Sequence, residues 1–430
     1  MAEVKISVSA DFDASPDNIV AFQTMVAQMV HETPDIQDMI CRHNTGFSYY
    51  SSLGYLTIRS HSEAQKLSPC LINTESVDRP NLKDISPESI KVYLPSADEP
   101  EEIVHSNTVL YSTLHLPHIH LQTMWDNIIL PDTVKTQLRQ LVRASKRLSS
   151  HNVDPNIVSV HKMLLLHSVP GCGKTSIATA LAQELSVDLA PPGRIITNTS
   201  LLITVNAHAL FSKWFSESGK IITRLFTSIA EEASDNKEIY LLIDEIESLA
   251  GSRERAMAAG EPSDMVRAAN AMLTQLDQLK RFNNVYILCT TNLIETLDPA
   301  FIDRCDAVIN LALPNDAARR LILEGVVAEL VEKQVLTSLL YTNAAAHSFN
   351  INVHSCSLGG NGKPCQQCSK CLEQARMQTL FNTIVTSSSG LSGRQLRKLP
   401  YTALSLCNAN DFSLTTFLKA FILLLQERQR

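Results

Sequence analysis

The stretch LLLHSVPGCGKTSIATALAQEL, Leu164–Leu185, constrains this chain more than any other part of its sequence. An apolar run precedes the glycines and a helix-forming run follows them, as in the strand–loop–helix cradles that bind phosphate groups. Gly171 and Gly173 occupy the inner loop positions, where a Cβ would obstruct a tight turn. Lys174 can reach the β- and γ-phosphates, and the Thr175 hydroxyl can ligate Mg²⁺. The stretch therefore predicts a nucleotide site.

One position departs from the usual cradle, because Ser168 stands where a glycine commonly opens the loop. Serine is small and tolerates turns, and this position lies where the strand ends, away from the closest phosphate contact. We therefore expect nucleotide binding to survive. The expected binding residues belong to the loop, to the start of the helix and to one later strand end. They are Ser168, Val169, Pro170, Gly171, Cys172, Gly173, Lys174, Thr175, Ser176 and Asp244.

Two adjacent carboxylates, Asp244 and Glu245, end the apolar run IYLLIDE. Open parallel sheets bind ligands at the carboxyl ends of their strands. We expect Asp244, together with Thr175, to hold the Mg²⁺ shell, and Glu245 to orient or deprotonate the attacking water. A solvated acidic pair would be a reasonable alternative in isolation, but the cradle favours the catalytic interpretation.

Three further polar residues complete the predicted catalytic set with Glu245. Asn292 ends the run NVYILCTTN and is suited to hydrogen-bond the γ-phosphate or the water. Arg304 follows that strand, a position that favours an arginine finger reaching a neighbouring subunit. Arg394 begins a helix in GLSGRQLRKLP and is placed to report nucleotide state from a second domain.

The apolar runs KMLLLHS, LLITVNA, IYLLIDE and NVYILCTTN alternate with helical stretches, which is typical of a parallel sheet covered on both faces. We predict an α/β fold with a large nucleotide-binding domain over residues 119–313 and a small helical domain over 314–430. An α+β domain is expected over 1–100, with strands in EVKISVSAD, GYLTIRSHS and SIKVYLP, and a linker over 101–118.

Composition excludes few function classes. The net charge of −7 gives no broad electrostatic footprint for nucleic acid. No apolar run approaches the length of a membrane span, and the N-terminus lacks the layout of a secretory signal. Ten cysteines without secretory context favour reduced thiols and a location in the cytosol or nucleus.

The nucleotide-site residues resemble the ATPase module of AAA+ proteins, and longer blocks narrow the resemblance to the pachytene-checkpoint AAA+ ATPase family, which includes the animal thyroid-receptor-interacting member. The likeness spans roughly residues 125–430. The blocks that carry it are HALFSKWFSESGK (208–220), IDEIESLAGSRERAMAAGEPSD (243–264), NAMLTQLDQLKR (270–281) and GLSGRQLRKLP (390–400).

The resemblance implies a hexameric ring that binds ATP and Mg²⁺ between its subunits. It also implies a substrate class, the HORMA-domain proteins of checkpoints and meiotic axes, which the family converts from closed to open forms or strips from complexes and chromosome axes. An adaptor with its own HORMA fold would present checkpoint substrates, and the N-terminal domain would bind substrate and adaptor. Nucleus and cytoplasm are the implied compartments, with chromosomes and kinetochores as places of action.

The chain departs from the family pattern in its phosphate loop and near its finger arginine. Ser168 and Val169 stand where the family usually has Gly and Pro, and Cys172 stands where Thr is common. The sequence DRCD offers one finger arginine, Arg304, whereas many AAA+ relatives have two. These departures bear on turnover and nucleotide affinity more than on fold.

Trp214 and Phe215, in FSKWFSESGK, lie between a predicted strand and a predicted helix. An aromatic pair on a loop there could grip an extended peptide through nonspecific apolar contact, as translocation through a pore requires. The alternative is that both rings pack in the core. The charged stretch SRERAMAAGEPSD is either a second pore loop or a solvated helix end.

Two clusters contain residue types that can bind metal ions, but each has an explanation without a metal. His115, His118 and His120 lack other ligands at metal spacing, which favours a structural or solvent-facing role. Of four cysteines near the end of the chain, three form two overlapping Cys-x-x-Cys spacings and one lies upstream. This pattern fits half of a zinc site, but a loop with reduced thiols is the favoured interpretation. The four cysteines are Cys356, Cys365, Cys368 and Cys371.

Three functional hypotheses follow. The leading one is an ATP-driven protein remodeller. A nucleic-acid motor or clamp loader of the AAA+ kind is disfavoured by the acidic balance and by the aromatic pore residues, since nucleic-acid channels favour basic linings. A ring that binds nucleotide for assembly without hydrolysing it is motivated by Ser168.

Overall fold

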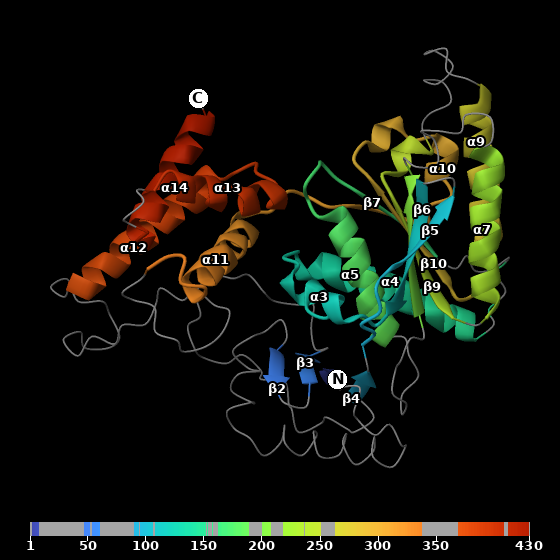
Figure 1. Cartoon of the computed structure of the whole chain (residues 1–430), viewed down its shortest axis with the longest axis horizontal. Coiled ribbons are helices and arrows are strands. Elements are labelled where there is room, and N and C mark those ends of the chain that lie inside the picture. Colours follow the sequence, from blue (N-terminus) through green and yellow to red (C-terminus); the bar gives the residue numbers. More distant parts are fainter. Residues whose placement is uncertain are drawn as a thin grey trace. The chain divides into compact units, whose positions relative to one another are not determined.

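The fold is given by a computed structural model, in which the chain divides into two compact units (Figure 1). The first comprises residues 1–128, 132–168 and 174–310, and the second comprises 129–131, 169–173 and 311–430. The structure describes residues 2–7, 47–51, 54–60, 90–93, 95–105, 108–151, 153, 157, 162–188, 200–207, 218–235, 237–250, 263–337, 369–407 and 412–429.

A seven-stranded sheet in the order β11-β7-β10-β9-β8-β6-β5 organises the first unit. Pairing is parallel from β11 through β8, and β6 and β5 join antiparallel at the edge. The predicted α/β fold with a parallel sheet is confirmed. The strands are β5 (Glu101–His105), β6 (Thr108–Leu116), β7 (Met163–His167), β8 (Ser200–Asn206), β9 (Glu238–Asp244), β10 (Val285–Thr291) and β11 (Ala307–Asn310).

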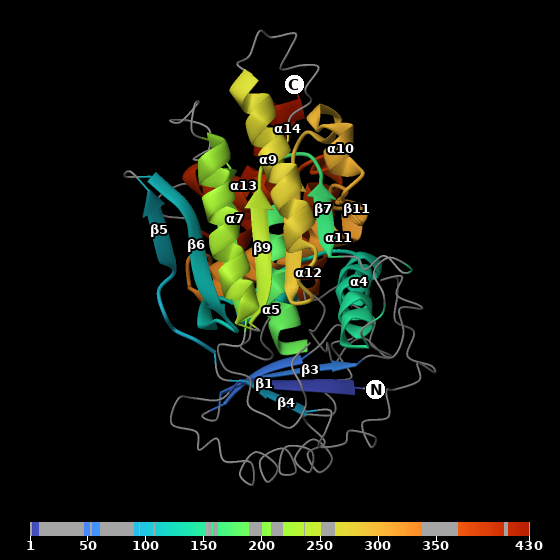
Figure 2. The ribbon, with the colours of Figure 1, turned by 90° about the vertical axis from the view of Figure 1, so that its right-hand side faces the viewer.

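Helices cover both faces of this sheet. Figures 1 and 2 show α7 and α9 together on one face and α5 on the other. Every residue of β10 is buried, as its continuous apolar sequence requires for a strand covered on both sides. The described helices of this unit longer than one turn are α3 (Met124–Asn127), α4 (Asp132–Ser150), α5 (Lys174–Asp188), α7 (Ser218–Ser234), α9 (Ser263–Leu279) and α10 (Pro299–Ile302). Short 3₁₀ turns lie at η3 (Ile119–Leu121), η4 (Ile246–Ser248) and η5 (Ile294–Thr296).

The expected linker over residues 101–118 was wrong. Most of this segment forms β5 and β6, and β6 pairs with β8 in the register that places Tyr111 opposite Val205. Leu110, Tyr111 and Leu116 are buried. The acidic, proline-containing sequence before β6 suggested a solvated connection, but an unpaired β8 would leave a row of backbone N–H and C=O groups open at the sheet edge. Pairing with β6 satisfies them.

The N-terminal part contains a separate four-stranded sheet in the order β2-β3-β1-β4. β1 (Ala2–Ser7), β3 (Gly54–Ser60) and β4 (Ile90–Tyr93) are the three strands expected from the sequence, and β2 (Phe47–Ser51) adds a hairpin partner to β3. β1 pairs antiparallel with β3 and parallel with β4. The helix expected after Pro16 lies outside the described residues.

Helices make up most of the described part of the second unit, as expected after Pro314. They are α11 (Asp316–Glu332), α12 (Ser369–Ser387), α13 (Gly393–Ser405) and α14 (Leu414–Gln429). Their apolar faces share one core that includes Phe381, Leu396 and Phe417. Ser392 caps α13, because its hydroxyl accepts the N–H of Gln395 while the Gln395 side chain accepts the N–H of Ser392. This cap fixes where α13 begins, and so places Arg394 in its first turn.

Candidate nucleotide-binding and hydrolysis site

The predicted phosphate loop leaves β7 and leads into α5 at Lys174. Gly171 and Gly173 both have φ of +86°, a backbone conformation that favours glycine. A Cβ at Gly171 would also lie 2.7 Å from the Ser392 hydroxyl, and the N–H of Arg394 donates to the Gly171 carbonyl at 3.0 Å. The steric obstruction expected from the sequence is therefore present at Gly171, whereas a Cβ at Gly173 would meet nothing within 4 Å and only the positive φ favours glycine there.

Ser168 does not have the left-handed backbone that would call for glycine, since Glu245 and Gln334 are the non-glycine residues with positive φ in the described chain. It is buried, and its N–H donates to the Thr291 carbonyl at 3.4 Å. Its side chain faces the loop lysine, because Lys174 Nζ donates to the Ser168 carbonyl at 3.0 Å and to its Oγ at 3.3 Å. The serine thus adds a side-chain acceptor for the lysine, whereas the usual glycine would offer its backbone carbonyl alone.

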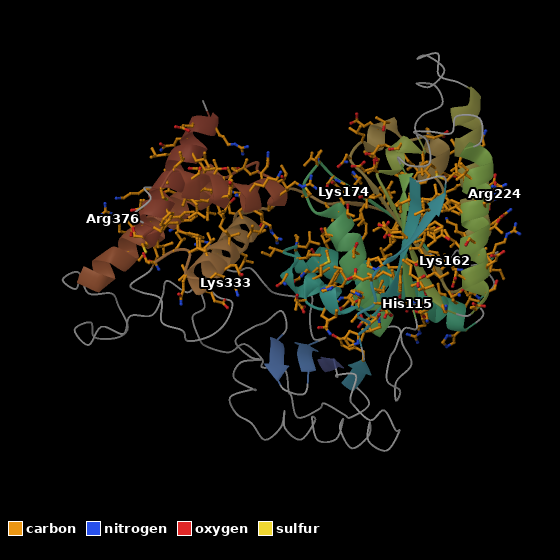
Figure 3. The ribbon with its side chains drawn as sticks, viewed as in Figure 1. His115, Lys162, Lys174, Arg224, Lys333 and Arg376 are labelled. Atoms are coloured by element: carbon orange, nitrogen blue, oxygen red, sulfur yellow. The ribbon has the colours of Figure 1, made fainter. Side chains whose placement is uncertain are left out.

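Lys174 begins α5 and is 7% exposed (Figure 3). Besides its bonds to Ser168, its Nζ donates to Asn292 Oδ1 at 2.6 Å. Asn292 directly follows β10, the strand beside β7, so the sheet brings together two residues that are 118 positions apart. Burial, and secondly the Lys174 charge, lower the pKa of His167, so this neighbouring imidazole is neutral at neutral pH.

Thr175 and Asp244 meet at the start of α5 and the end of β9. The Thr175 hydroxyl lies 2.9 Å from Asp244 Oδ1 and 3.0 Å from Oδ2. A hydroxyl and a carboxylate next to a phosphate loop form the oxygen donor set that Mg²⁺ uses when phosphates and water complete its shell. Among the described residues, no three His, Cys, Asp or Glu side chains gather into a metal centre made by protein alone. The donor set fits a Mg²⁺ ion shared with a nucleotide.

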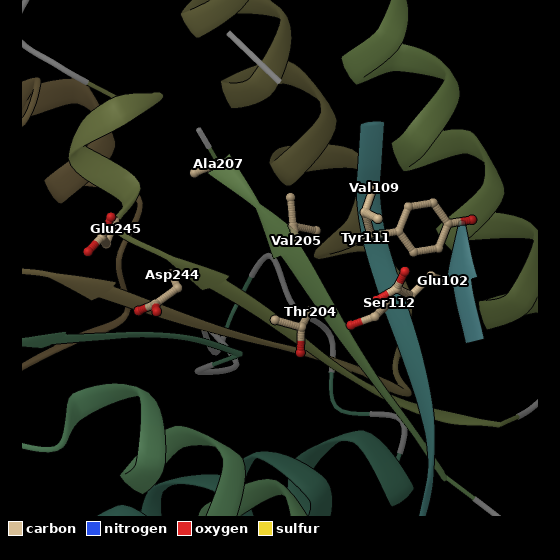
Figure 4. A pocket seen from close by; sticks show the side chains of 9 residues that line it. All are labelled: Glu102, Val109, Tyr111, Ser112, Thr204, Val205, Ala207, Asp244 and Glu245. Carbon is tan, nitrogen blue, oxygen red and sulfur yellow. The ribbon is translucent and has the colours of Figure 1, made fainter. Parts of the chain in front are cut away.

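Glu245 follows Asp244 but has a different backbone, with φ of 53° and ψ of 50°. Asp244 and Glu245 are among the residues that line a cavity of about 300 Å³ (Figure 4). Thr204 and Ser112, from β8 and β6, and Glu102, from β5, add polar groups to its lining. Since a water molecule takes up about 30 Å³, several waters fit beside Glu245.

Two residues near these carboxylates were missed by the sequence interpretation. Thr290, in β10, contacts Asp244 Oδ1 through its hydroxyl and accepts the N–H of Glu245 at 3.2 Å. Glu247 Oε1 accepts the N–H of Asn292 at 3.2 Å. The signal available in the sequence was a pair of threonines inside the apolar run VYILCTT, since hydroxyls in a buried strand need partners.

Arg304 lies after α10 and is turned towards α9. Its Nε donates to both carboxylate oxygens of Asp277 at 3.1 Å, and its NH1 donates to the Ala300 carbonyl at 2.7 Å. It does not join Lys174, Thr175 and Asp244 within its own chain, so its finger role remains a prediction. Arg394 is exposed in the first turn of α13.

His118 has the structural role that the sequence favoured. It is buried, its Nδ1 accepts the N–H of His120 at 3.3 Å, and its Nε2 lies 3.1 Å from the Asp98 carbonyl.

Several predicted features lie outside the described residues: Trp214, Phe215, the stretch 251–262, Cys356, Cys365 and Cys368. Cys371 lies in α12, and the structure describes its backbone only.

Comparisons with known proteins agree with this geometry. Residues 164–313 match the model of the ATPase family associated with various cellular activities (AAA), and residues 315–429 match the TRIP13-like AAA+ ATPase lid C-terminal domain. A pachytene checkpoint protein 2 homolog from Gallus gallus is 33% identical over 400 residues, which cover 91% of this chain and 87% of the relative. The chain belongs to the pachytene checkpoint protein 2 family of AAA ATPases.

One solved structure supports the same assignment, and a second shares the fold. PCH-2 of Caenorhabditis elegans matches with a TM-score of 0.72 and 29% identity, covering 100% of this chain and 99% of that one. A chain of the Escherichia coli HORMA:CdnC:Trip13 complex shares the fold, with a TM-score of 0.51, 14% identity and coverage of 73% and 94%. The family resemblance seen in the sequence is confirmed, and the chain is a nucleotide-binding ATPase. None of the described helices is both long and apolar enough to cross a membrane.

Proposed function

We propose that this member of the pachytene checkpoint protein 2 family remodels HORMA-domain proteins at the expense of ATP. Family membership supports the proposal, and so does the cluster of Lys174, Thr175, Asp244 and Asn292 at the carboxyl end of the parallel sheet. A protein of the same fold, Trip13 of E. coli, has been solved in a complex with a HORMA protein. Closed-to-open conversion, release from checkpoint complexes and removal from meiotic axes would be the outcomes, in the nucleus and cytoplasm.

The side chains of the site have different roles in the proposed hydrolysis. ATP with Mg²⁺, when bound, supplies the phosphoryl group and the cation that offsets its charge. Lys174 would bind the phosphate oxygens, and Thr175 and Asp244 would hold the ion. Glu245 accepts a proton from water at its carboxylate, beside the cavity that admits solvent. Asn292 orients the reactants and, through its bond to Lys174, keeps the lysine at the loop.

We further propose a homo-hexamer in which Arg304 acts on the nucleotide of the neighbouring subunit. Arg304 is held through its Nε by Asp277 and through its NH1 by the Ala300 carbonyl, while its NH2 has no hydrogen bond to the described residues and the side chain is one-third exposed. The backbone carbonyl of Arg304 is in turn bound by Lys280 Nζ from the end of α9. The arginine is thus fixed to a helix and still reachable by a second copy.

Mixing two inactive variants tests this arrangement. Arg304→Ala and Lys174→Met are each expected to lower ATP turnover at least about tenfold. Co-expressed in one ring, they should recover turnover about threefold or more above either alone, because an Arg304→Ala subunit keeps its lysine and receives Arg304 from its neighbour. Turnover of the mixture that never exceeds the mean of the two variants would show that Arg304 does not act across subunits.

The remodelling itself is tested at Trp214, in the predicted pore loop between β8 and α7. Trp214→Ala is expected to keep ATP turnover within about threefold of wild type and to lower opening of a HORMA substrate at least about tenfold, because a loop aromatic grips extended peptide through apolar contact. Opening is followed by size-exclusion chromatography of the closed and open forms. Trp214→Phe, which keeps an aromatic ring, should retain most of the opening.

Unchanged opening by Trp214→Ala would remove the pore role of this residue. Measuring ATP turnover with either a HORMA protein or DNA added separates the proposed function from a nucleic-acid motor or clamp loader. Stimulation of turnover by the HORMA protein supports remodelling, whereas stimulation by DNA and not by protein would overturn it.

A further inference from the structure

Glu245 has a backbone conformation that its own residue type does not favour. Its φ of 53° and ψ of 50° lie in the left-handed region, which a side chain with a Cβ occupies at a cost. Such a conformation persists when surrounding contacts hold it, and it is found preferentially at active sites. The direction of the Glu245 carboxylate depends on this backbone, so whatever holds the backbone also aims the carboxylate.

One side-chain contact to this backbone comes from Thr290, in addition to the N–H of Ser248, which donates to the Glu245 carbonyl at 3.0 Å. Thr290 is in β10, the strand beside β9, and is 0% exposed. Its hydroxyl oxygen accepts the N–H of Glu245 at 3.2 Å, and the same hydroxyl donates its proton to Asp244 Oδ1. One hydroxyl can do both, because it has one proton to give and lone pairs to accept. Asp244 and Glu245 are thus tied to a single oxygen atom.

We infer that Thr290 is a positioning residue for ATP hydrolysis, whose hydroxyl fixes the Glu245 backbone and the Asp244 carboxylate relative to each other. The inference rests on the proposed role of Glu245 as the residue that activates water. If the hydroxyl is removed, the backbone N–H of Glu245 loses its acceptor and the left-handed conformation loses a contact that opposes its relaxation. A carboxylate displaced by about 1 Å from its reacting position can cost about 100-fold in rate.

Thr290→Val is the variant that isolates this hydroxyl, since valine keeps the branched shape of the buried side chain and removes both hydrogen bonds. ATP turnover at saturation is expected to fall about tenfold or more, because the carboxylate is no longer held in place. Affinity for ATP is expected to stay within about threefold of wild type, because Lys174 and the loop glycines are not touched. Thr290→Ser, which keeps the hydroxyl, should restore turnover to within about threefold of wild type.

The neighbouring residue is a matched control. Thr291 is also 0% exposed, and its hydroxyl accepts the N–H of Leu293 at 3.1 Å. Successive side chains of a strand point to opposite faces, so Thr291 lies on the other face of β10 from Thr290. Thr291→Val therefore removes a buried hydroxyl from the same strand without releasing Asp244 or Glu245. We expect its turnover to stay within about threefold of wild type, with a fall in thermal midpoint similar to that of Thr290→Val.

These outcomes distinguish a positioning role of Thr290 from a general contribution to stability. Equal losses of turnover in the two valine variants, or no rescue by Thr290→Ser, would overturn the inference. If Thr290→Val does not yield folded protein, the comparison of Thr290→Ala with Thr290→Ser replaces it. Glu245→Gln tests the proposed role of Glu245 separately from the role of Thr290. If Glu245→Gln abolishes turnover while Thr290→Val does not lower it, the inference about Thr290 fails and the proposed role of Glu245 stands. If Glu245→Gln turns over like wild type, the proposed role of Glu245 fails.

Discussion

Replacing Glu245 by glutamine is expected to lower the rate of ATP hydrolysis at least about 100-fold, because the amide cannot take a proton from water. The change keeps the size of the side chain, and it does not touch Lys174, the loop glycines or the Thr175–Asp244 pair. Affinity for nucleotide should therefore stay near that of the wild type. Steady-state release of inorganic phosphate and titration with a fluorescent ATP analogue measure the two quantities separately.

Glu238→Gln provides a control at the other end of the same strand. Glu238 begins β9, pairs with Lys146 and lies 3.3 Å from the Tyr240 hydroxyl, so its loss affects local contacts without reaching the site. Its turnover should match the wild type. A Glu245→Gln protein that hydrolyses ATP as fast as the wild type would instead favour the noncatalytic ring, which binds nucleotide for assembly.

Replacing Lys174 by methionine is expected to weaken ATP binding about 100-fold or more, since charge-assisted contacts to phosphate contribute about 1.5–3 kcal/mol each. Methionine has a similar length and fills the same buried space without the charge. The loss extends to Ser168 and Asn292, whose oxygens would lose the ammonium group that they now share. Isothermal titration with ATP in the presence of Mg²⁺ measures the effect.

A second buried lysine in the same unit shows whether a general loss of stability explains the result. Lys162 Nζ donates to the carbonyls of Lys280 and Phe282 at 3.0 Å and to Asn283 Oδ1 at 3.2 Å (Figure 3). Lys162→Met removes these three bonds and should lower the thermal midpoint while ATP affinity stays near that of the wild type. Equal losses of affinity in both variants would mean that Lys174 acts on the fold and not on the phosphates.

Much of the candidate site could be predicted because its signals are local. The loop glycines, Lys174 and Thr175 fall within five residues, and Asp244 and Asn292 each directly end or follow a buried strand. Parallel strands present their carboxyl ends at one edge, so strand assignment alone placed these residues together. The contact between Lys174 and Asn292 confirms that they lie together, while their roles in catalysis remain predictions.

What the sequence did not reveal depends on pairings between distant segments. Thr290 acts on Asp244 and Glu245 because β10 lies beside β9, and Asp277 holds Arg304 because α9 ends near α10. A threonine in a strand and an aspartate on a helix carry no local mark of such partners. The mistaken linker has the same origin, since β6 is a strand through its pairing with β8 more than through its own composition.

The sequence by itself determined the α/β class and the phosphate loop, because glycine positions, strand-end carboxylates and apolar periodicity follow from local sterics and burial. The family was indicated separately, by the resemblance of longer sequence blocks to known members. The tertiary structure alone decided the left-handed backbone of Glu245, the buried hydroxyl that holds it and the attachment of Arg304 to α9. These features exist because folding brings together groups far apart in the chain, and a buried polar group is satisfied by whichever neighbour the sheet places beside it.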